Sequence, residues 1–373
     1  MSTKALSPEA CHRIVHCARR SDLPALCLTS KSLQKDAEIR LYEVIMTGDM
    51  HATFRACESI VTQERLGPYV RSFYVFQNSR RSQTESLPRR FWQMVQKALW
   101  KMRCLDVLYI DDPARANAWV LSDIPRIPFQ LRDATFRLPC NQHLVEFLES
   151  QNKLKQFQIM GGPDEHAPHF KAGTLPHLRT FDGQLALAMQ LLSVPRKLRR
   201  LRIPLDRDTN KKLLDFIPHL AALSRTLRSL NIIHIPEELS VEAIKLISSV
   251  CPDLHYLGII PLPMTFPHVS RALYLFHVAY LYRYLKRSVI HDALLAMHHL
   301  RDLELDVSRW SPLPTGSLQR MLTTELHIYC LSIEKIIFRT GTNRTLWYFD
   351  GNEWNSHSDD GQHMLIDGLW KAG

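Results

Sequence analysis

A six-residue phrase recurs along the chain from about residue 67 onward, with apolar residues at its first, fourth and sixth positions. Most copies follow a segment with the apolar spacing of a helix, and successive copies start mostly 20 to 35 residues apart. One helix and one short strand cannot bury their own apolar faces, so such units must stack on one another. The pattern therefore predicts an α/β array of strand–helix units. Its ten copies, some degenerate, are VRSFYV (70–75), LDVLYI (105–110), LRDATF (131–136), LKQFQI (154–159), LRTFDG (178–183), LRRLRI (198–203), LRSLNI (227–232), LHYLGI (254–259), LRDLEL (300–305) and IEKIIF (333–338).

This phrase and its period resemble those of leucine-rich repeats, whose units stack into a curved solenoid. In that arrangement the third and fifth positions of each phrase project onto a concave sheet face. These positions are rich in Tyr, Arg, Asn and Gln, which suit a protein interface, although an exposed sheet without a partner carries similar residues. The candidate target-binding residues are Tyr74, Tyr109, Gln158, Arg199, Arg200, Arg202, Asn231 and Tyr256.

The second position of the phrase is basic in seven of its ten copies. Each such cation comes just after a predicted helix, where it can satisfy the last helical carbonyls and the helix dipole. A binding stripe for acidic protein or phosphate is the other interpretation, and the segment RKLRRLR (196–202) would be its strongest patch. The second-position residues are Arg71, Asp106, Arg132, Lys155, Arg179, Arg199, Arg228, His255, Arg301 and Glu334.

The first residues have the start signals of a helix, because Ser7 can cap it, Pro8 suits its first turn and Glu9 complements the dipole. One stripe of this helix carries Ala10, Ile14, Cys17 and Ala18. The stretch CHRIVHC (11–17) is rich in metal-binding residue types. A structural zinc site needs four converging ligands, and Cys11 and Cys17 point apart on a helix, so we expect no metal here.

Two more short helices are predicted, one capped by Ser21 or Asp22 and the other near Lys31 to Tyr42. Their apolar residues exceed what three short helices can bury among themselves. The surplus predicts a docking face for a partner.

The stretch "LSPEACHRIV…DLPALCLTSKSLQKDAEIRLYEVI" resembles the F-box of many fungal proteins over residues 6 to about 45. The resemblance implies docking onto the Skp adaptor and, through it, onto a cullin. Carried over position by position, the implied adaptor contacts are Leu6, Pro8, Glu9, Ile14, Val15, Leu23, Leu26, Leu28 and Leu33.

The predicted organisation is an F-box-like helical domain over 1–45, a connecting helix over 46–66 and the solenoid over 67–373. A helical insertion near 262–296 separates two copies of the phrase, and a polar loop spans 77–90. The C-terminal part near 340–373 reads as a hairpin cap around Asp350–Gly351. Its aromatic residues are expected to shield the end of the array: Trp347, Phe349, Trp354 and Trp370.

Composition narrows the function further. Among 373 residues there are only 13 glycines, and no phosphate-loop, dinucleotide or nucleophile-elbow motif is present. The eight cysteines are scattered, and no signal peptide or membrane span is evident, so we expect a cytoplasmic or nuclear protein. The net charge of +10 favours acidic partners only in a general way. The segment HDALLAMHH (291–299) offers an enzyme interpretation through His291, Asp292, His298 and His299, but it lacks a nucleophile or a third oriented ligand.

Together these features predict the substrate-recognition subunit of a Skp–cullin–F-box ubiquitin ligase, binding the adaptor by its N-terminal helices and a target protein by its solenoid. We expect no enzymatic activity, no cofactor, no metal, no membrane and no nucleic-acid partner. The alternative is a non-ligase interaction scaffold with a decayed F-box. Ser7, Arg19 and Arg20 favour it, because they depart from the family's pattern.

Overall fold

The computed structural model describes residues 7–76, 87–123, 126–161, 169–194, 196–206, 208–263, 287–358 and 368–371. It is a mixed α/β protein that divides into two compact units, Met1–Leu178 and Arg179–Gly373. The sequence predicted one continuous array from residue 67, so this division was not foreseen. Leu6, most of the predicted polar loop (77–86) and most of the predicted helical insertion (264–286) lie outside the described residues.

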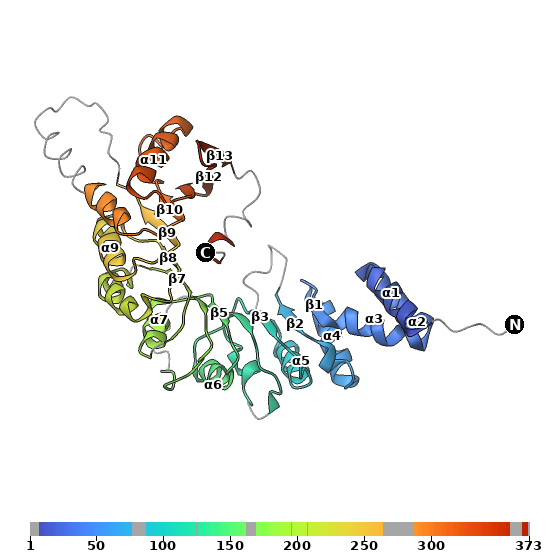
Figure 1. Ribbon diagram of the computed structural model, residues 1–373. Helices are drawn as coiled ribbons and strands as arrows, with labels where there is room; N and C mark the ends of the chain where they lie inside the picture. The colour runs from blue at the N-terminus through green and yellow to red at the C-terminus, as the bar shows by residue number, and fades with distance from the viewer. Residues whose placement is uncertain are drawn as a thin grey trace, which may run out of the picture. The chain divides into compact units, whose positions relative to one another are not determined.

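The first unit contains the N-terminal helices and five parallel strands with helices between them (Figure 1). Its helices are α1 (Pro8–Cys17), α2 (Leu23–Thr29), α3 (Lys31–Glu43), α4 (Met50–Thr62), α5 (Arg89–Leu99) and α6 (Gln142–Ser150), with 3-10 turns η1 (Arg20–Asp22), η2 (Gly67–Tyr69) and η3 (Ala118–Leu121). Its strands are β1 (Val44–Met46), β2 (Ser72–Val75), β3 (Val107–Asp111), β4 (Asp133–Arg137) and β5 (Gln156–Ile159).

Helices α1, α2 and α3 share a small hydrophobic core of their own. Ser7 caps α1 as predicted, since its hydroxyl accepts from the amide of Ala10 at 3.2 Å. Ser30 caps α3, whereas neither Ser21 nor Asp22 caps α2. The buried members of this core are Cys11, Val15, Leu23, Leu33 and Ala37.

The inward stripe of α1 differs from the predicted one by one residue. Cys11 and Val15 face the core, while Ile14 is 41% exposed and Cys17 is exposed. Ala18 alone of the predicted stripe packs partly against the core. One residue is about 100° of helix rotation, so this change turns Ile14 outward.

The sheet of the first unit begins earlier than residue 67. Helix α3 runs directly into β1, and Val44 pairs with Ser72 of β2 in parallel register. Arg65 donates to the carboxylate of Glu38 at 2.7 Å and so ties α3 to the segment after α4. The N-terminal helices are therefore fixed to the first strands rather than joined by a free linker.

The second unit repeats the strand–helix pattern and ends in a hairpin. Its strands are β6 (Thr180–Asp182), β7 (Arg200–Pro204), β8 (Ser229–Ile233), β9 (Tyr256–Pro261), β10 (Asp302–Asp306), β11 (Lys335–Thr340), β12 (Asn343–Phe349) and β13 (Trp354–Ser358). Its helices are α7 (Leu185–Leu192), α8 (Leu213–Phe216), α9 (Glu237–Val250) and α11 (Gly316–Tyr329), with turns η5 (Asn210–Lys212) and η6 (Ile217–Leu223). Residues 287–295 and 368–371 are also helical. Strands β6 to β11 are parallel, and β11, β12 and β13 are antiparallel.

Each of the ten predicted phrases forms a strand that starts at or next to its third residue. The backbone repeats with the same regularity: the carbonyl of one second-position residue accepts two amides from the next strand. Arg199, for example, accepts from Arg228 at 2.8 Å and from Ser229 at 3.0 Å, and Arg228 accepts from His255 and Tyr256 in the same way. This hydrogen-bond ladder keeps the first, fourth and sixth positions of successive phrases in line.

Those aligned apolar positions form the core of each unit. Leu198, Leu201 and Ile203 are at most 1% exposed, and Leu227, Leu230 and Ile232 are fully buried. Burying one such side chain stabilises the fold by about 1.5–3 kcal/mol. Because each strand–helix repeat buries its apolar face against the neighbouring repeat, no single repeat is stable alone.

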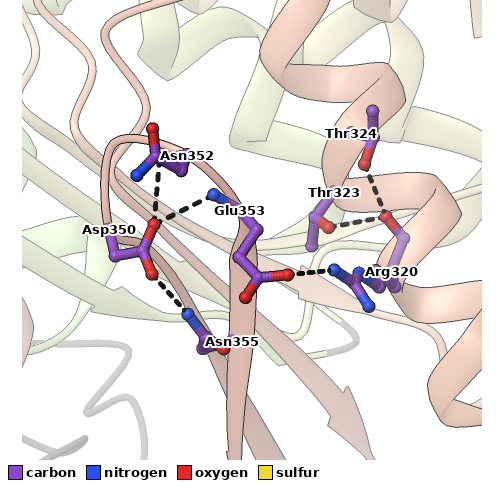
Figure 2. A network of polar contacts seen from close by, with 7 residues as sticks. All are labelled: Arg320, Thr323, Thr324, Asp350, Asn352, Glu353 and Asn355. Atoms are coloured by element: carbon purple, nitrogen blue, oxygen red, sulfur yellow. Dashed lines mark hydrogen bonds and ion pairs between the residues drawn. The ribbon is translucent and has the colours of Figure 1, made fainter.

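The predicted C-terminal hairpin is present as β12 and β13. Asp350 holds its turn, since its Oδ1 accepts from the amides of Asn352 and Glu353, both at 2.9 Å (Figure 2). Gly351 in the same turn has φ of 99°. Arg320 of α11 donates to Glu353 at 2.7 Å and links the turn to the helix (Figure 2). The ring of Phe349 lies 5.4 Å from that of Trp354, and Trp347 donates to Gln319 of α11 at 2.9 Å. Trp347, Phe349 and Trp354 thus pack between the hairpin and α11, as expected of a cap.

Strand β9 requires a glycine at position 258. A Cβ atom on Gly258 would lie 2.6 Å from the hydroxyl oxygen of Tyr256, closer than real Cβ contacts allow. The missing side chain gives the Tyr256 ring room to lie along its own strand. Gly316, at the start of α11, has no atom within 4 Å of such a position.

We expect Gly258→Ala to lower the free energy of unfolding by about 1–3 kcal/mol, because the added methyl must displace a buried ring. Gly316→Ala is the matched control and should cause no loss. Urea unfolding followed by circular dichroism measures both values. Equal stability of the two variants would contradict this account of β9.

Candidate functional site

The predicted adaptor contacts divide into core and surface. Val15, Leu23 and Leu33 lie in the core of the three helices and are not available to a partner. The patterns that mark apolar positions do not separate these two groups, because both kinds of residue recur at helical spacing. The contacts that remain at least partly exposed are Pro8, Glu9, Ile14, Leu26 and Leu28.

Two large apolar side chains dominate what these helices expose. Leu28 of α2 is 89% exposed and Ile14 of α1 is 41% exposed. Leu26 is half-buried against the core. Ile14 lies on α1 and Leu26 and Leu28 lie on α2, and we use the name N-terminal apolar patch for these three residues taken together.

The metal-binding residue types of α1 do not converge. Cys11 lies in the core and Cys17 at the surface. His12 and His16 stack on each other with ring centroids 6.0 Å apart, and His12 lies 3.6 Å from Asp36. Both histidines are exposed, whereas Cys11 is buried.

Residues 291–299 do not gather into a reactive group either. His291 lies 3.0 Å from Glu325 and stacks on Tyr329 at 3.8 Å. Asp292, His298 and His299 are exposed. His291 thus belongs to a contact between this helical segment and α11.

The third and fifth positions of the phrase form one face of the sheet in each unit, and we call it the open face. In the first unit the rings of Tyr74 and Tyr109 lie 6.0 Å apart, and Phe76 meets Tyr109 edge-on at 5.9 Å. Burial, followed by the charge of Asp111, raises the pKa of Tyr109. Gln158 is half-buried on the same face. These predicted residues are accessible to a partner.

The open face of the second unit is a buried polar network, which the sequence did not predict. Tyr256 and Asn231 are 1% and 3% exposed, although both were expected to face a partner. The Tyr256 hydroxyl donates to Glu304 Oε2 at 2.7 Å, and Arg344 of β12 lies 3.7 Å from the other oxygen of that carboxylate. Arg202 lies 3.6 Å from Asp182.

A segment from the end of the chain explains part of this burial. Residues 368–371 lie on the side of β7–β9 opposite helices α7 and α9 (Figure 1). Trp370 is 2% exposed, its carbonyl accepts from the Ser229 hydroxyl at 2.6 Å, and the Arg202 guanidinium lies 5.7 Å from the centre of its ring. Trp370 was predicted to cap the end of the array with the hairpin, and that prediction is wrong.

Burial also shifts the pKa values of the acidic groups on this face. Burial raises the pKa of Asp182, opposed by Arg202 and Lys371. Burial likewise raises the pKa of Glu304 and, together with Glu304, raises that of Tyr256 well above its usual value. The sequence analysis did not predict Glu304 and Asp182 as site residues, because it considered only aromatic, basic and amide side chains at the third and fifth positions of the phrase. Carboxylates at those same positions were the available signal.

The basic patch around RKLRRLR divides between two surfaces. Arg199 is exposed at the edge of the sheet, whereas Arg200 and Arg202 are half-buried on the open face. Burial and the charge of Arg199 lower the pKa of Arg200. Arg200 and Arg202 are two residues apart on β7 and share the open face, whereas Arg199 precedes the strand, so the three residues do not form one continuous basic patch.

The second-position cations have mixed roles. Arg71 donates to the carbonyl of Cys104 at 3.3 Å, and Arg228 donates to that of Asp253 at 3.4 Å, but both carbonyls lie beyond the ends of α5 and α9, so these contacts do not cap a helix. Arg132, Arg179, Arg199 and Arg301 are exposed. In the second unit, burial and then the charges of Arg228 and Arg301 lower the pKa of His255. The binding interpretation thus stays open for the exposed members.

We expect Glu304→Gln to stabilise the protein at neutral pH. The raised pKa means that the folded state holds the proton more tightly, so the stability from this group is lost as pH rises from about 4.3, the unfolded value. The gain in unfolding free energy of this variant over wild type should therefore vanish below about pH 4.

Tyr256→Phe should have the opposite effect and lower the free energy of unfolding by about 1–3 kcal/mol at neutral pH, because it removes the hydroxyl that donates to Glu304. Denaturant unfolding at several pH values tests both, and a pH-independent effect of Glu304→Gln would contradict the assignment.

The candidate functional surfaces are thus the N-terminal apolar patch and the two open faces. Within the described ranges, no group of three or more His, Cys, Asp or Glu side chains is arranged to hold a metal ion. No helix in the described part of the chain is both long and apolar enough to cross a membrane. No protein-family model matches this chain, and no curated protein matches it either.

Proposed function

We propose that this protein is the substrate-recognition subunit of a Skp–cullin–F-box ubiquitin ligase. The observation that carries the proposal is the N-terminal apolar patch: three helices with their own core still expose Leu28 and Ile14. Exposed apolar side chains of that size on a small helical unit suit a protein contact. In this proposal the patch contacts the Skp adaptor, and the adaptor connects the chain to a cullin.

The strand–helix repeats are the proposed target-binding part, as an irregular solenoid of the leucine-rich-repeat type. The strands are parallel, and residues at the same position of successive phrases lie side by side across them, which supports that assignment. Such a receptor needs no reactive group, because it works by holding the target near the ubiquitin-loaded enzyme. The direct run of α3 into β1 and the Glu38–Arg65 ion pair suit that role, since they fix the adaptor contact to the first repeats.

A non-ligase scaffold with a decayed F-box is the second candidate. It is favoured by the burial of Val15, Leu23 and Leu33, which leaves a small apolar patch for the adaptor. Two departures from the family's pattern do not favour it. Ser7 caps α1, and Arg20 donates to the carbonyls of Leu41 and Val44. These residues therefore have uses within the helical unit itself.

We expect the double variant Ile14→Asp/Leu28→Asp to lose co-purification of the Skp adaptor by at least about tenfold, since each charge would be buried at the contact. Its own stability should change by less than about 0.5 kcal/mol per site, because both positions are exposed. Leu331→Asp is the matched control, as Leu331 is 78% exposed in the second unit.

Affinity purification with mass spectrometry reads out adaptor, cullin and captured targets, with and without proteasome inhibition. The ligase proposal expects targets that accumulate under inhibition. Wild-type preparations that contain no adaptor, and whose captured partners have the same abundance with and without proteasome inhibition, would instead support the scaffold.

A further inference from the structure

The open face of the second unit already holds a peptide, which is the chain's own residues 368–371. The contact resembles recognition of a ligand, because it combines a main-chain hydrogen bond with an aromatic anchor. The Ser229 hydroxyl donates to the carbonyl of Trp370, and Arg202 lies over the indole ring. Trp and Arg are the residue types that most often anchor protein interfaces.

The next residue of this segment meets the opposite charge. The Nζ atom of Lys371 lies 5.5 Å from the centre of the Trp370 ring, and its charge opposes the rise in the pKa of Asp182, which lies 3.6 Å from Arg202. The carboxyl group of Asp182 on this face suits a cation directly after the aromatic residue. Ser229, Arg202 and Asp182 come from three adjacent strands, so the parallel register sets their spacing.

This occupant satisfies the site poorly. Among the described residues of this open face, six buried polar atoms have no hydrogen-bond partner: Trp370 Nε1, Arg200 Nε, Arg202 Nε, Asn231 Oδ1, Asp302 Oδ1 and Glu304 Oε1. A buried indole N–H usually finds an acceptor, and unpaired buried polar atoms cost free energy. Asn231 and Glu304 are each 3% exposed. Glu304 Oε1 has Arg344 at 3.7 Å, whereas a donor from another ligand would satisfy Asn231 Oδ1.

We propose that this part of the open face is the target-binding site, that it binds a protein segment with Trp followed by Lys or Arg, and that residues 368–371 occupy it in competition with that segment. The proposal rests on the proposed function and names its target class. A tethered occupant acts at a high effective concentration, so it lowers the apparent affinity for a free peptide. Targets that also supply a donor to Asn231 would displace it.

The probe is a fluorescent peptide with the sequence LIDGLWKAG, which is residues 365–373. Fluorescence anisotropy measures its binding to the full-length wild type and to full-length Trp370→Ala, whose site is vacated. We expect Trp370→Ala to bind at least about tenfold more tightly than wild type. Control peptides with Ala in place of Trp, or Glu in place of Lys, should lose this binding.

Lys371→Glu is a second variant for the case that Trp370→Ala does not fold. It reverses the charge beside Asp182, leaves Trp370 in place, and should give an intermediate gain in peptide affinity. Thermal unfolding checks that each preparation is folded. Equal affinity of a folded variant and wild type, absence of binding to either, or equal binding of the control peptides would overturn the proposal.

Adaptor co-purification from the same preparations keeps this inference separate from the proposed function. Loss of the adaptor from wild type would count against the ligase and leave the peptide result to stand alone. Adaptor recovery without any peptide binding would count against the Trp–cation target class only.

Discussion

The structure depends on one repeated hydrogen-bond arrangement, in which a second-position carbonyl accepts two amides from the next strand. Arg179, Arg199, Arg228 and His255 follow each other in this way in the second unit, and Asp106 and Arg132 do so in the first. The arrangement fixes the register of parallel strands, and register decides which side chains share a face. The buried leucines on one side and the polar open face on the other both follow from it.

The same register creates the chemistry of the open face. Polar residues at the third and fifth positions come to lie in rows across neighbouring strands, so Asp182, Arg202 and Asn231 are neighbours although they are far apart in sequence. Once a segment covers such a row, its groups must pair with one another. Tyr256 and Glu304 pair well, whereas Asn231 Oδ1 has no hydrogen-bond partner in the described residues. A face that is covered yet incompletely paired is suited to exchange one occupant for another.

The N-terminal helices solve a different problem with few residues. A unit of this size must use most of its apolar side chains for its own core, and Val15, Leu23 and Leu33 serve that purpose. Few apolar side chains remain exposed for a partner, so the rotation of α1 about its axis decides which of them a partner can contact. Because Cys11 and Val15 face inward, Ile14 is left at the surface close in sequence to the start of the chain.

The sequence by itself determined the strands and the inward residues of every phrase, because a period of two and helical spacing are local properties. It also predicted the hairpin at Asp350–Gly351 and the N-terminal cap of α1, since turns and caps depend on neighbouring residues. The rotation of α1 and the burial of Asn231 and Tyr256 were decided only by the tertiary structure. Cys11 faces inward because it meets side chains of two later helices, and Ser229 meets Trp370 across 141 residues of chain. Contacts between distant segments leave no periodic trace in the sequence, and it is these contacts that separate a core residue from a binding residue.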